Sequence, residues 1–383
     1  MHPDGILFCG GGTGGHVLPG LSVAAALRAR GRTGLRWIGD PQRIEAKLVP
    51  NAGITLLPYG LSRPRPTSPR WIIAALGQAW ACFRELSHRP PRVVVALGGY
   101  AALLPGLLAP LTRRPLIVLE QNARPGRTNR LLARFADAVV TQFPEAAAEL
   151  PVGRVRLLGN PVRVIRPAAR GHEPRLRLLV VGGSLAAKSL NDLVLGAAAR
   201  LATRADLHLV HIAGEDDRER VAAAYASAGF GGPGAATCEV FGFVADMPAL
   251  YDRIDLALSR AGATTVAELC AGGIGALYVP LPWAAEDHQT ANARAVERIG
   301  GARVLPQATT RGDDLASAVE GLLADRGAVA AMGAHALALA RPHAAAHVAD
   351  LVDRVDRRRL PRDRAASRAR FQRARAGNPG VTP

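Results

Sequence analysis

The feature that most constrains the fold of this chain is a unit that occurs twice, in which a short apolar run leads into glycines and then into a helical pattern. The first copy has the apolar run Ile6 to Cys9, the turn GGGTGGH from Gly10 to His16, and helical spacing from Leu18 to Leu27. The second copy has the run Leu178 to Val181, followed by Gly182 to Ser184. Glycines let a backbone approach a ligand closely, and the N–H groups of a helix start attract anions. The repeat therefore predicts two nucleotide-type domains and favours phosphate or sugar binding.

Apolar runs alternate with helical patterns through the rest of the chain, and such alternation is typical of parallel, doubly wound sheets. The runs are Leu35–Ile38, Val93–Leu97, Leu116–Leu119 and Ala138–Thr141 in the first half, and Leu207–Ala213, Leu256–Ser259 and Ala276–Val279 in the second. We therefore predict an α/β fold with two Rossmann-like domains, each a doubly wound parallel sheet, that face one another across a cleft.

The chain is expected to divide where proline and arginine concentrate and periodicity ends, at residues 159–174. We assign residues 1–162 to an N-terminal domain and residues 163–342 to a C-terminal domain. A helical pattern at 343–355 follows a proline, and by analogy with other two-domain proteins of this architecture we expect it to return to the first domain. Residues 356–383 have almost no apolar content and are predicted to be a disordered basic tail.

The formal charge of +17 suggests nucleic acid as a partner, but its distribution does not support that reading. The tail contains nine arginines and two aspartates, a balance of +7. No RNA-binding aromatic signature accompanies it, and aromatic residues make up only 4% of the chain. We interpret the tail as a solvating appendage, with contact to anionic lipid or RNA as the alternative, and expect no specific nucleic-acid partner.

Four scattered cysteines without a CxxC pair indicate neither a disulfide framework nor a zinc site, which favours a reducing cytosol. No positively charged start followed by an apolar region precedes the first strand, so a secretory signal is not expected. The uncharged stretch Val93 to Thr112 is as long as a membrane span, but its glycines and prolines would leave backbone groups unpaired in lipid. We interpret it as a buried strand, a glycine turn and a short helix.

A basic, amphipathic segment between Arg63 and Arg89 is a candidate for lying on a membrane surface. Arginines flank a set of bulky apolar residues that recur near helical spacing. These apolar residues are Trp71, Ile72, Leu76, Trp80 and Phe83. Such a helix can rest among the headgroups of an anionic leaflet. The alternative is a helix packed on the sheet of the first domain with its tryptophans in the core.

The first glycine turn also fits GxGxxG through Gly10, Gly12 and Gly15. Asp40 ends the next strand, about where a ribose-binding acid stands in dinucleotide-binding domains, so a dinucleotide-binding oxidoreductase is an alternative. His16 counts against it, because a histidine near a helix start is disfavoured as imidazolium and can accept a proton near neutral pH. We interpret His16 as a catalytic base; the other interpretation is a capping or packing residue.

The second half carries the most specific block, which reads FGFVADM from Phe241, SRAGATTVAEL from Ser259 and VPLPWAAEDHQTANA from Val279. A strand is predicted to end at Ser259 and a helix to begin near Gly262, so small residues and N–H groups would meet a phosphate there. Glu268 lies about one turn further in, where a carboxylate can accept two ribose hydroxyls. The alternative for Glu268 is a solvated charge on the helix face.

Five motifs occur in one order: the GGTGGHVxPG turn, EQN at Glu120 to Asn122, GNPVR at Gly159 to Arg163, the GGS turn and the RxGAxTxxE block. With them the chain resembles, from about residue 5 to 350, the MurG family, bacterial cell-wall N-acetylglucosaminyltransferases with a GT-B fold. The resemblance implies transfer of N-acetylglucosamine from UDP-N-acetylglucosamine to the undecaprenyl-diphosphate-linked muramyl-pentapeptide (lipid I), giving lipid II with inversion at the anomeric carbon. It also implies a peripheral enzyme on an anionic membrane surface, the cytoplasmic face of the inner membrane, and no cofactor beyond the donor.

The resemblance implies site residues as well. The implied contacts are Thr13, Gly14, Gly15 and Asn122 with the donor sugar and diphosphate side; Arg163 and Ser184 with the phosphates; the Val244 backbone with uracil; Ala263, Thr264 and Thr265 with diphosphate and sugar; Glu268 with the ribose; His288 and Gln289 with sugar hydroxyls; and Tyr100 and Arg260 elsewhere in the substrate site. His16 would be the base on the acceptor hydroxyl, while helix N-termini and arginine would relieve the charge of the departing UDP. No DxD motif is present, so no catalytic metal is predicted.

Three positions depart from the family pattern, each with an apolar residue in place of a polar one. Leu185 stands where the family has Gln after GGS, Leu119 where it has His before EQN, and Ala102 near where it has Ser after GGY. They leave open another GT-B UDP-sugar transferase or epimerase with a different acceptor, or a non-catalytic UDP-sugar-binding protein. The joint presence of the candidate base, Arg163 and Glu268 favours an enzyme.

Overall fold

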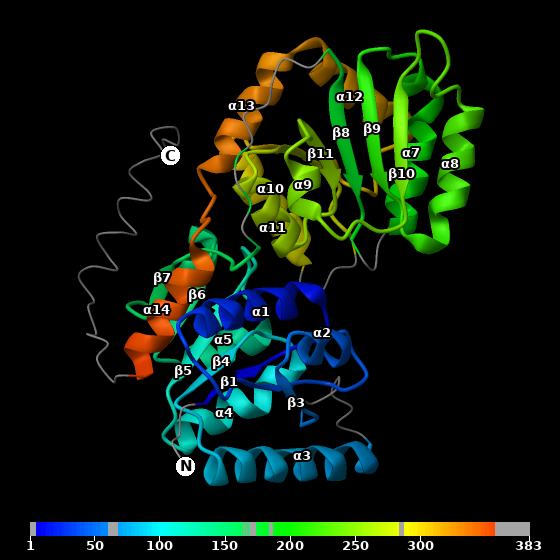
Figure 1. Ribbon diagram of the computed structural model, residues 1–383. Coiled ribbons are helices and arrows are strands. Elements are labelled where there is room, and N and C mark those ends of the chain that lie inside the picture. The colour runs from blue at the N-terminus through cyan, green and yellow to red at the C-terminus, as the bar shows by residue number, and fades with distance from the viewer. Residues whose placement is uncertain are drawn as a thin grey trace. The chain divides into compact units, whose positions relative to one another are not determined.

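The computed structural model describes residues 5–59, 68–163, 165, 167, 174–183, 187–282 and 287–356. The described chain forms two compact units. One holds the residues up to Val162 together with those from His343 onward, and the other runs from Arg163 to Pro342. Figure 1 shows the helices and strands of both units.

The first unit is built on a parallel sheet whose described strands follow the order β3-β2-β1-β4-β5-β6-β7. These strands are β1 (Ile6–Cys9), β2 (Arg36–Ile38), β3 (Thr55–Leu57), β4 (Val93–Ala96), β5 (Leu116–Glu120), β6 (Ala138–Thr141) and β7 (Val155–Leu157). Successive strands run outward from β1 to one edge and from β4 to the other. The order therefore reverses between β1 and β4, and in open α/β sheets such a switch point is where ligands bind, at the carboxyl ends of the strands.

Helices cover both faces of this sheet, because alternate residues of each strand point to opposite sides. The helices are α1 (Gly14–Ala29), α2 (Glu45–Asn51), α3 (Pro69–His88), the 3₁₀ turn η1 (Tyr100–Ala102), α4 (Leu103–Leu111), α5 (Arg127–Ala133), α6 (Pro144–Ala148) and α14 (Ala344–Asp356). Phe8 packs with α1 and α14 in one buried cluster, whereas its neighbours Leu7 and Cys9 pack with α3, α4 and α5 in another. In Figure 1, α1 lies on one side of β1 and β4, and α3 and α4 lie on the other.

The last described helix, α14, is held on the first unit by both its faces. Its apolar residues Val348 and Val352 are buried in the same cluster as Phe8. Its acidic face meets arginines of the first unit: Arg32 Nη2 lies 2.6 Å from Asp353 Oδ1 and 3.0 Å from Asp356 Oδ2. Burial and charge together place the end of the described chain against α1.

The second unit repeats the architecture with the described strand order β10-β9-β8-β11-β12-β13, again all parallel. Its strands are β8 (Leu176–Val181), β9 (Leu207–Ile212), β10 (Thr237–Phe241), β11 (Leu256–Ser259), β12 (Gly275–Tyr278) and β13 (Ala302–Val304). Its helices are α7 (Ala187–Ala202), the 3₁₀ turn η2 (Glu215–Asp217), α8 (Arg218–Ser227), α9 (Met247–Tyr251), α10 (Ala263–Ala271), α11 (His288–Arg298), α12 (Gly312–Ala324) and α13 (Arg326–Leu337). The switch point lies between β8 and β11.

The predicted pair of doubly wound parallel sheets is confirmed. Each apolar run named from the sequence is a strand, with ends shifted by no more than two residues. The stretch from Val93 to Thr112 folds as β4, a glycine turn, η1 and α4, as expected. No helix among the described residues is long and apolar enough to cross a bilayer.

Candidate substrate sites at the two switch points

The glycine turn after β1 packs backbone to backbone against the turn after β4. A Cβ on Gly10 would lie 2.8 Å from the Gly98 carbonyl oxygen, and a Cβ on Gly99 would lie 2.8 Å from the Gly11 carbonyl oxygen. Gly10, Gly98 and Gly99 also have positive φ angles of 143°, 97° and 73°. Side chains are excluded here by space and by backbone conformation, so the first switch point presents bare peptide groups.

His16 lies in the first turn of α1, directly above these glycines. Its Nδ1 is 3.1 Å from the Gly11 carbonyl oxygen and 3.2 Å from Thr13 Oγ1. A carbonyl oxygen only accepts, so this contact assigns the proton of the neutral ring to Nδ1 and the lone pair to Nε2. A Cβ on Gly98 would lie 3.2 Å from Nε2, so the proton-accepting edge of His16 lies at the second glycine turn.

A carboxylate of the protein itself occupies the inner side of the first glycine turn. Gly12 N donates to both oxygens of Glu45, at 3.1 and 3.0 Å, and Asp40 N donates to Oε1 at 3.1 Å. Asp40 Oδ1 in turn accepts from Gln42 N at 2.9 Å. In a dinucleotide-binding turn these N–H groups and this acid would serve the cofactor. Because Glu45 already occupies the turn, the geometry does not favour a dinucleotide-binding turn here. It favours the interpretation in which the glycine turn carries the candidate base His16.

In the EQN motif at the end of β5, Glu120 orients the neighbouring Asn122, and Asn122 is the residue that can contact a ligand. Glu120 is buried, and its Oε1 accepts from Asn122 N at 2.9 Å and Asn122 Nδ2 at 3.1 Å. Its Oε2 accepts from Gly126 N at 3.0 Å and Asn129 Nδ2 at 2.9 Å. Glu120 thus orients Asn122, which is half-buried. Tyr100, which follows the second glycine turn, is exposed.

At the second switch point, Arg260 follows β11 and is buried without a carboxylate partner among the described residues. Nη1 donates to the Val279 carbonyl at 2.8 Å and Nη2 to Ser189 Oγ at 2.6 Å, while Nε has no partner within the described part of the chain. Burial lowers the pKa of Arg260 to about 10. A buried cation with an unused donor attracts an anionic group. Ser184, which the resemblance assigned to the phosphates together with Arg163, lies outside the described residues.

Glu268 on α10 is buried and paired, which excludes the interpretation as a solvated charge. Its Oε1 lies 3.0 Å from Arg163 Nε, and its Oε2 accepts from the Tyr251 hydroxyl at 3.0 Å. Burial raises the pKa of Glu268, and the charge of Arg163 and the hydrogen bond from Tyr251 oppose that shift. The structure therefore brings together two residues that the sequence placed in separate motifs.

Two further side chains near these strand ends hold polar atoms that are buried without a partner among the described residues, namely Thr264 Oγ1 and His288 Nδ1. Ala263 and Thr265 belong with Thr264 to the first turn of α10. Gln289 Oε1 accepts from Leu281 N at 3.0 Å, so its amide NH₂ is the end that remains for a sugar hydroxyl. Buried polar groups are normally paired, so unpaired ones here are consistent with a place for a ligand.

Val244 follows the edge strand β10 and is half-buried, beside Phe243, whose side chain is 72% exposed. The structure thus leaves the backbone near Val244 at the surface of the second unit, as a base-contacting segment requires. Nothing in the described contacts of Val244 links it to Glu268 or Arg260.

Sequence reasoning missed Glu45, Glu120, Asn129 and Tyr251 as residues that support the site. Each of them is buried and supports the site through a hydrogen bond to another residue there. A single sequence does not show which polar side chains are buried or what they bond to, and only Glu120 lies inside a recognised motif, EQN.

Helix α3 carries an exposed apolar stripe. Ile73, Leu76 and Trp80 are 70%, 66% and 66% exposed, and Phe83 stacks on Trp80 with ring centroids 5.9 Å apart. The opposite side of the helix, with Cys82 and Leu86, is buried against the sheet. The alternative in which Trp80 belongs to the core is therefore wrong.

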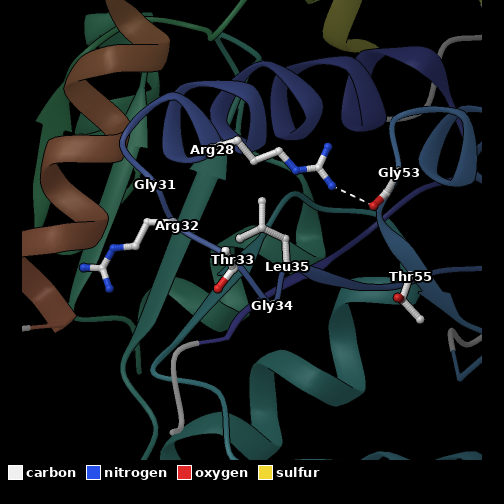
Figure 2. Close-up of a pocket in the computed structure, with 8 residues that line it drawn as sticks. All are labelled: Arg28, Gly31, Arg32, Thr33, Gly34, Leu35, Gly53 and Thr55. Atoms are coloured by element: carbon white, nitrogen blue, oxygen red, sulfur yellow. Dashed lines mark hydrogen bonds between the residues drawn. The ribbon is translucent and has the colours of Figure 1, made fainter.

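A separate hollow of about 510 Å³ in the first unit contains none of the expected site residues. Figure 2 shows it lined by the segments that lead into β2 and β3, with Arg28 and Arg32 at its rim. Arg28 Nη2 donates to the Gly53 carbonyl at 2.7 Å, and Arg32 is engaged by α14. Since the strands of this sheet are parallel, the hollow lies at their amino ends, the edge opposite the glycine turns.

No group of three or more His, Cys, Asp or Glu side chains in the described ranges is arranged to hold a metal ion.

Comparison with known proteins places these features in a family. Residues 6–141 match the glycosyltransferase family 28 N-terminal domain, and residues 177–355 match the C-terminal domain of the same family. A Bordetella parapertussis protein named UDP-N-acetylglucosamine–N-acetylmuramyl-(pentapeptide) pyrophosphoryl-undecaprenol N-acetylglucosamine transferase is 42% identical, over 94% of this chain and 99% of the relative. The chain belongs to the MurG family.

Two further MurG family members are similar along nearly their whole lengths. The Alkalilimnicola ehrlichii transferase of the same name is 44% identical, over 90% of this chain and 97% of that protein. The crystal structure of Acinetobacter baumannii MurG superposes with a TM-score of 0.78 at 33% identity, covering 91% of this chain and 99% of that one.

Within this MurG family chain, two of the departures from the family pattern are apolar residues of the core. Leu119 and Ala102 are almost wholly buried, one on each face of the first sheet. Leu185 lies outside the described residues.

Proposed function

We propose that this chain transfers N-acetylglucosamine from UDP-N-acetylglucosamine to the undecaprenyl-diphosphate-linked muramyl-pentapeptide, with inversion at the anomeric carbon. Relatives over 40% identical along nearly the whole chain carry this activity in their names. The observation that carries the proposal is that three of the five family motifs directly follow a central strand: the first glycine turn follows β1, the GGS turn follows β8 and the RxGAxTxxE block follows β11, at the switch points where α/β folds bind ligands.

The second unit binds the donor nucleotide in this proposal. Glu268 accepts two ribose hydroxyls, and the Val244 backbone meets the uracil. Arg260 and Arg163 attract the diphosphate, which also faces the N-terminus of α10 at Ala263, Thr264 and Thr265. Gln289 and His288 bind hydroxyls of the sugar, and Ser184 joins the phosphate contacts. The unpaired Arg260 Nε and Thr264 Oγ1 support this assignment.

His16 is the general base in the first unit. Its Nε2 accepts the proton of the acceptor hydroxyl while that oxygen bonds to the anomeric carbon of the donor. The bond from that carbon to the diphosphate breaks on the opposite side, and UDP leaves with the electron pair. Thr13, Gly14, Gly15 and Asn122 contact the donor sugar and diphosphate side in this proposal, and Tyr100 belongs to the substrate site.

Charge relief for the departing UDP comes from protein groups. In this proposal Arg260, Arg163 and the N–H groups at the start of α10 meet the negative charge that develops on the diphosphate; Arg260 is buried, whereas Arg163 is exposed. The proposal uses no metal ion and no cofactor besides the donor.

The lipid acceptor is reached through a membrane-facing surface on the first unit, at the cytoplasmic face of the inner membrane. The exposed stripe of α3 provides bulky apolar side chains, and Arg70, Arg84 and Arg89 flank it. Apolar area inserted among headgroups and arginines paired with lipid phosphates would hold the chain peripherally on an anionic leaflet.

A thermal-shift panel tests the donor assignment. At equal concentrations, UDP-N-acetylglucosamine should raise the melting temperature more than UDP-glucose, UDP-galactose or NAD, because a ligand that binds only the folded state stabilises it more the more tightly it binds. A larger shift with NAD would restore the dinucleotide alternative. Preference for another UDP-sugar would support a transferase of different specificity.

A further inference from the structure

A fully buried carboxylate lies beneath the glycine turn that carries the candidate base. Glu45 is the first residue of α2 and accepts hydrogen bonds from Gly12 N and Asp40 N. Burying a carboxylate is unfavourable unless donors surround it, and here both donors are backbone groups of the site. A Cβ on Gly11 would overlap the Glu45 carboxylate, so the two residues are in direct contact.

One peptide group joins Glu45 to His16. The N–H of Gly12, which donates to Glu45, and the carbonyl of Gly11, which accepts from His16 Nδ1, belong to the same peptide unit. That unit is planar and trans, so its N–H and C=O point in opposite directions. When Glu45 holds the N–H of Gly12 in place, the carbonyl of Gly11 therefore stays directed toward His16. The two hydrogen bonds are connected through this peptide group, so they also polarise one another.

A glycine pair needs such a restraint. The peptide between Gly11 and Gly12 has no side chain on either side to hinder its rotation, and Gly12 has a φ of 89° that few other residues adopt. If the peptide flipped, its N–H would face His16, and the ring would keep a hydrogen bond there only with Nδ1 as the acceptor. Nε2 would then carry the proton and could not act as a base.

We propose that Glu45 is a positioning residue of the transfer reaction, which orients the Gly11–Gly12 peptide and thereby holds the His16 tautomer with its lone pair on Nε2. This inference rests on the proposed role of His16 as the base. It assigns no contact between Glu45 and either substrate, so its effect is confined to the base and the turn.

The experiment compares Glu45→Ala and Glu45→Gln with the native chain, using UDP release in the presence of a short-chain soluble acceptor. Glu45→Ala should lower kcat by about ten- to a hundredfold, the range expected when a catalytic group is held less well, with the KM for UDP-N-acetylglucosamine nearly unchanged. Glu45→Gln should retain more activity, because one amide oxygen can still accept from Gly12 N.

Nitrogen NMR of the histidine-labelled protein supplies a readout that a purely structural role would not change. The His16 signal, identified by its loss in His16→Ala, should show the Nδ1-protonated tautomer in the native chain and a mixture of tautomers in Glu45→Ala. Asp137→Ala is the matched control, because Asp137 Oδ2 also accepts from a backbone N–H, that of Leu116 at 2.9 Å, at the opposite edge of the same sheet. It should lower the melting temperature without changing kcat or the tautomer.

Glu45 variants whose His16 tautomer matches that of the native chain would overturn the inference, whatever their melting temperatures. The inference would also be overturned if Glu45→Ala lowered kcat no more than Asp137→Ala does. Failure of the proposed function is distinct: His16→Ala would then keep native turnover.

Discussion

Nε of Arg163 lies 3.0 Å from Oε1 of Glu268, within the second unit. The resemblance to the MurG family implied that these residues contact different parts of one nucleotide, the phosphates and the ribose. Each oxygen of Glu268 has one described hydrogen bond, from Arg163 or from Tyr251, and keeps another lone pair. Both oxygens therefore keep an acceptor position for the ribose hydroxyls that we propose bind there, while Arg163 still neutralises the buried carboxylate.

Glu268→Ala should weaken UDP binding by about 1.5 to 3 kcal/mol, the usual range for hydrogen bonds to a charged group. Calorimetry with UDP and with its 2′,3′-dideoxyribose analogue measures this, and only the UDP affinity should fall. Glu320→Ala is the control, because that glutamate pairs with Arg200 on the helices α12 and α7. An equal loss for both ligands would show that Glu268 acts on structure rather than on the ribose.

Arg260→Met should weaken the binding of UDP by about tenfold or more and leave the binding of uridine nearly unchanged. The reason is that the arginine is proposed to meet the phosphates, and a charged hydrogen bond contributes about 1.5 to 3 kcal/mol. Titrations of both ligands give the comparison, with Arg200→Met as the exposed control. Comparable losses for uridine and UDP would move Arg260 from the phosphate site to a structural role.

Trp80→Ser combined with Phe83→Ser should reduce sedimentation with vesicles of anionic lipid and slow the reaction on the native lipid acceptor. Activity on a short-chain soluble acceptor should stay nearly unchanged, because both side chains are exposed on α3. The melting temperature is the control for folding. If both acceptors react more slowly by the same factor, α3 does not provide the membrane contact, and the arginine-rich tail becomes the next candidate.

The pH dependence of stability should show the buried His211. Its Nδ1 accepts from the Tyr225 hydroxyl at 2.7 Å, and its Nε2 donates to Asn191 Oδ1 at 2.9 Å. Burial lowers the pKa of His211 from 6.5 to about 4. The unfolded chain therefore takes up this proton at a higher pH than the folded one, so stability is lost as pH falls from about 6.5 to about 4.

The loss from this histidine should reach about 3 kcal/mol near pH 4, at 1.36 kcal/mol per unit of pKa. Urea unfolding of the native chain and of His211→Gln at several pH values isolates it. The difference in unfolding free energy between the two proteins should shrink by that amount as pH falls. A difference that stays constant with pH would mean that folding leaves the pKa of His211 unchanged.

The sequence predicted the central strands well and missed the edges of both sheets. Strands such as β1, β4 and β11 are buried on both faces, so each reads as an unbroken apolar run. The strands not foreseen, β3, β7, β10 and β13, are the outermost ones of the two sheets. Residues of an edge strand are partly exposed and mixed in polarity, so no apolar run marks them.

The motifs predicted which residues form the candidate site but not which side chains support it. The glycines, His16, Arg260 and Glu268 stand in the recognisable spacings of the family motifs. Glu45 sits in an ordinary helical stretch, RIEAKLV, where a solvated glutamate is the usual outcome. Periodicity likewise predicted the apolar stripe of α3, but only packing shows which face is buried.

The most direct test of the central claim is a single-turnover assay with UDP-N-acetylglucosamine and the undecaprenyl-diphosphate-linked muramyl-pentapeptide, comparing the native chain with His16→Ala. The native chain should form the disaccharide with inverted, β-configured linkage, as read from the anomeric proton coupling. His16→Ala should bind UDP with native affinity and react about two to four orders of magnitude more slowly, the contribution typical of a general base. A native chain that forms no disaccharide, or a His16→Ala variant with native turnover, would contradict the account.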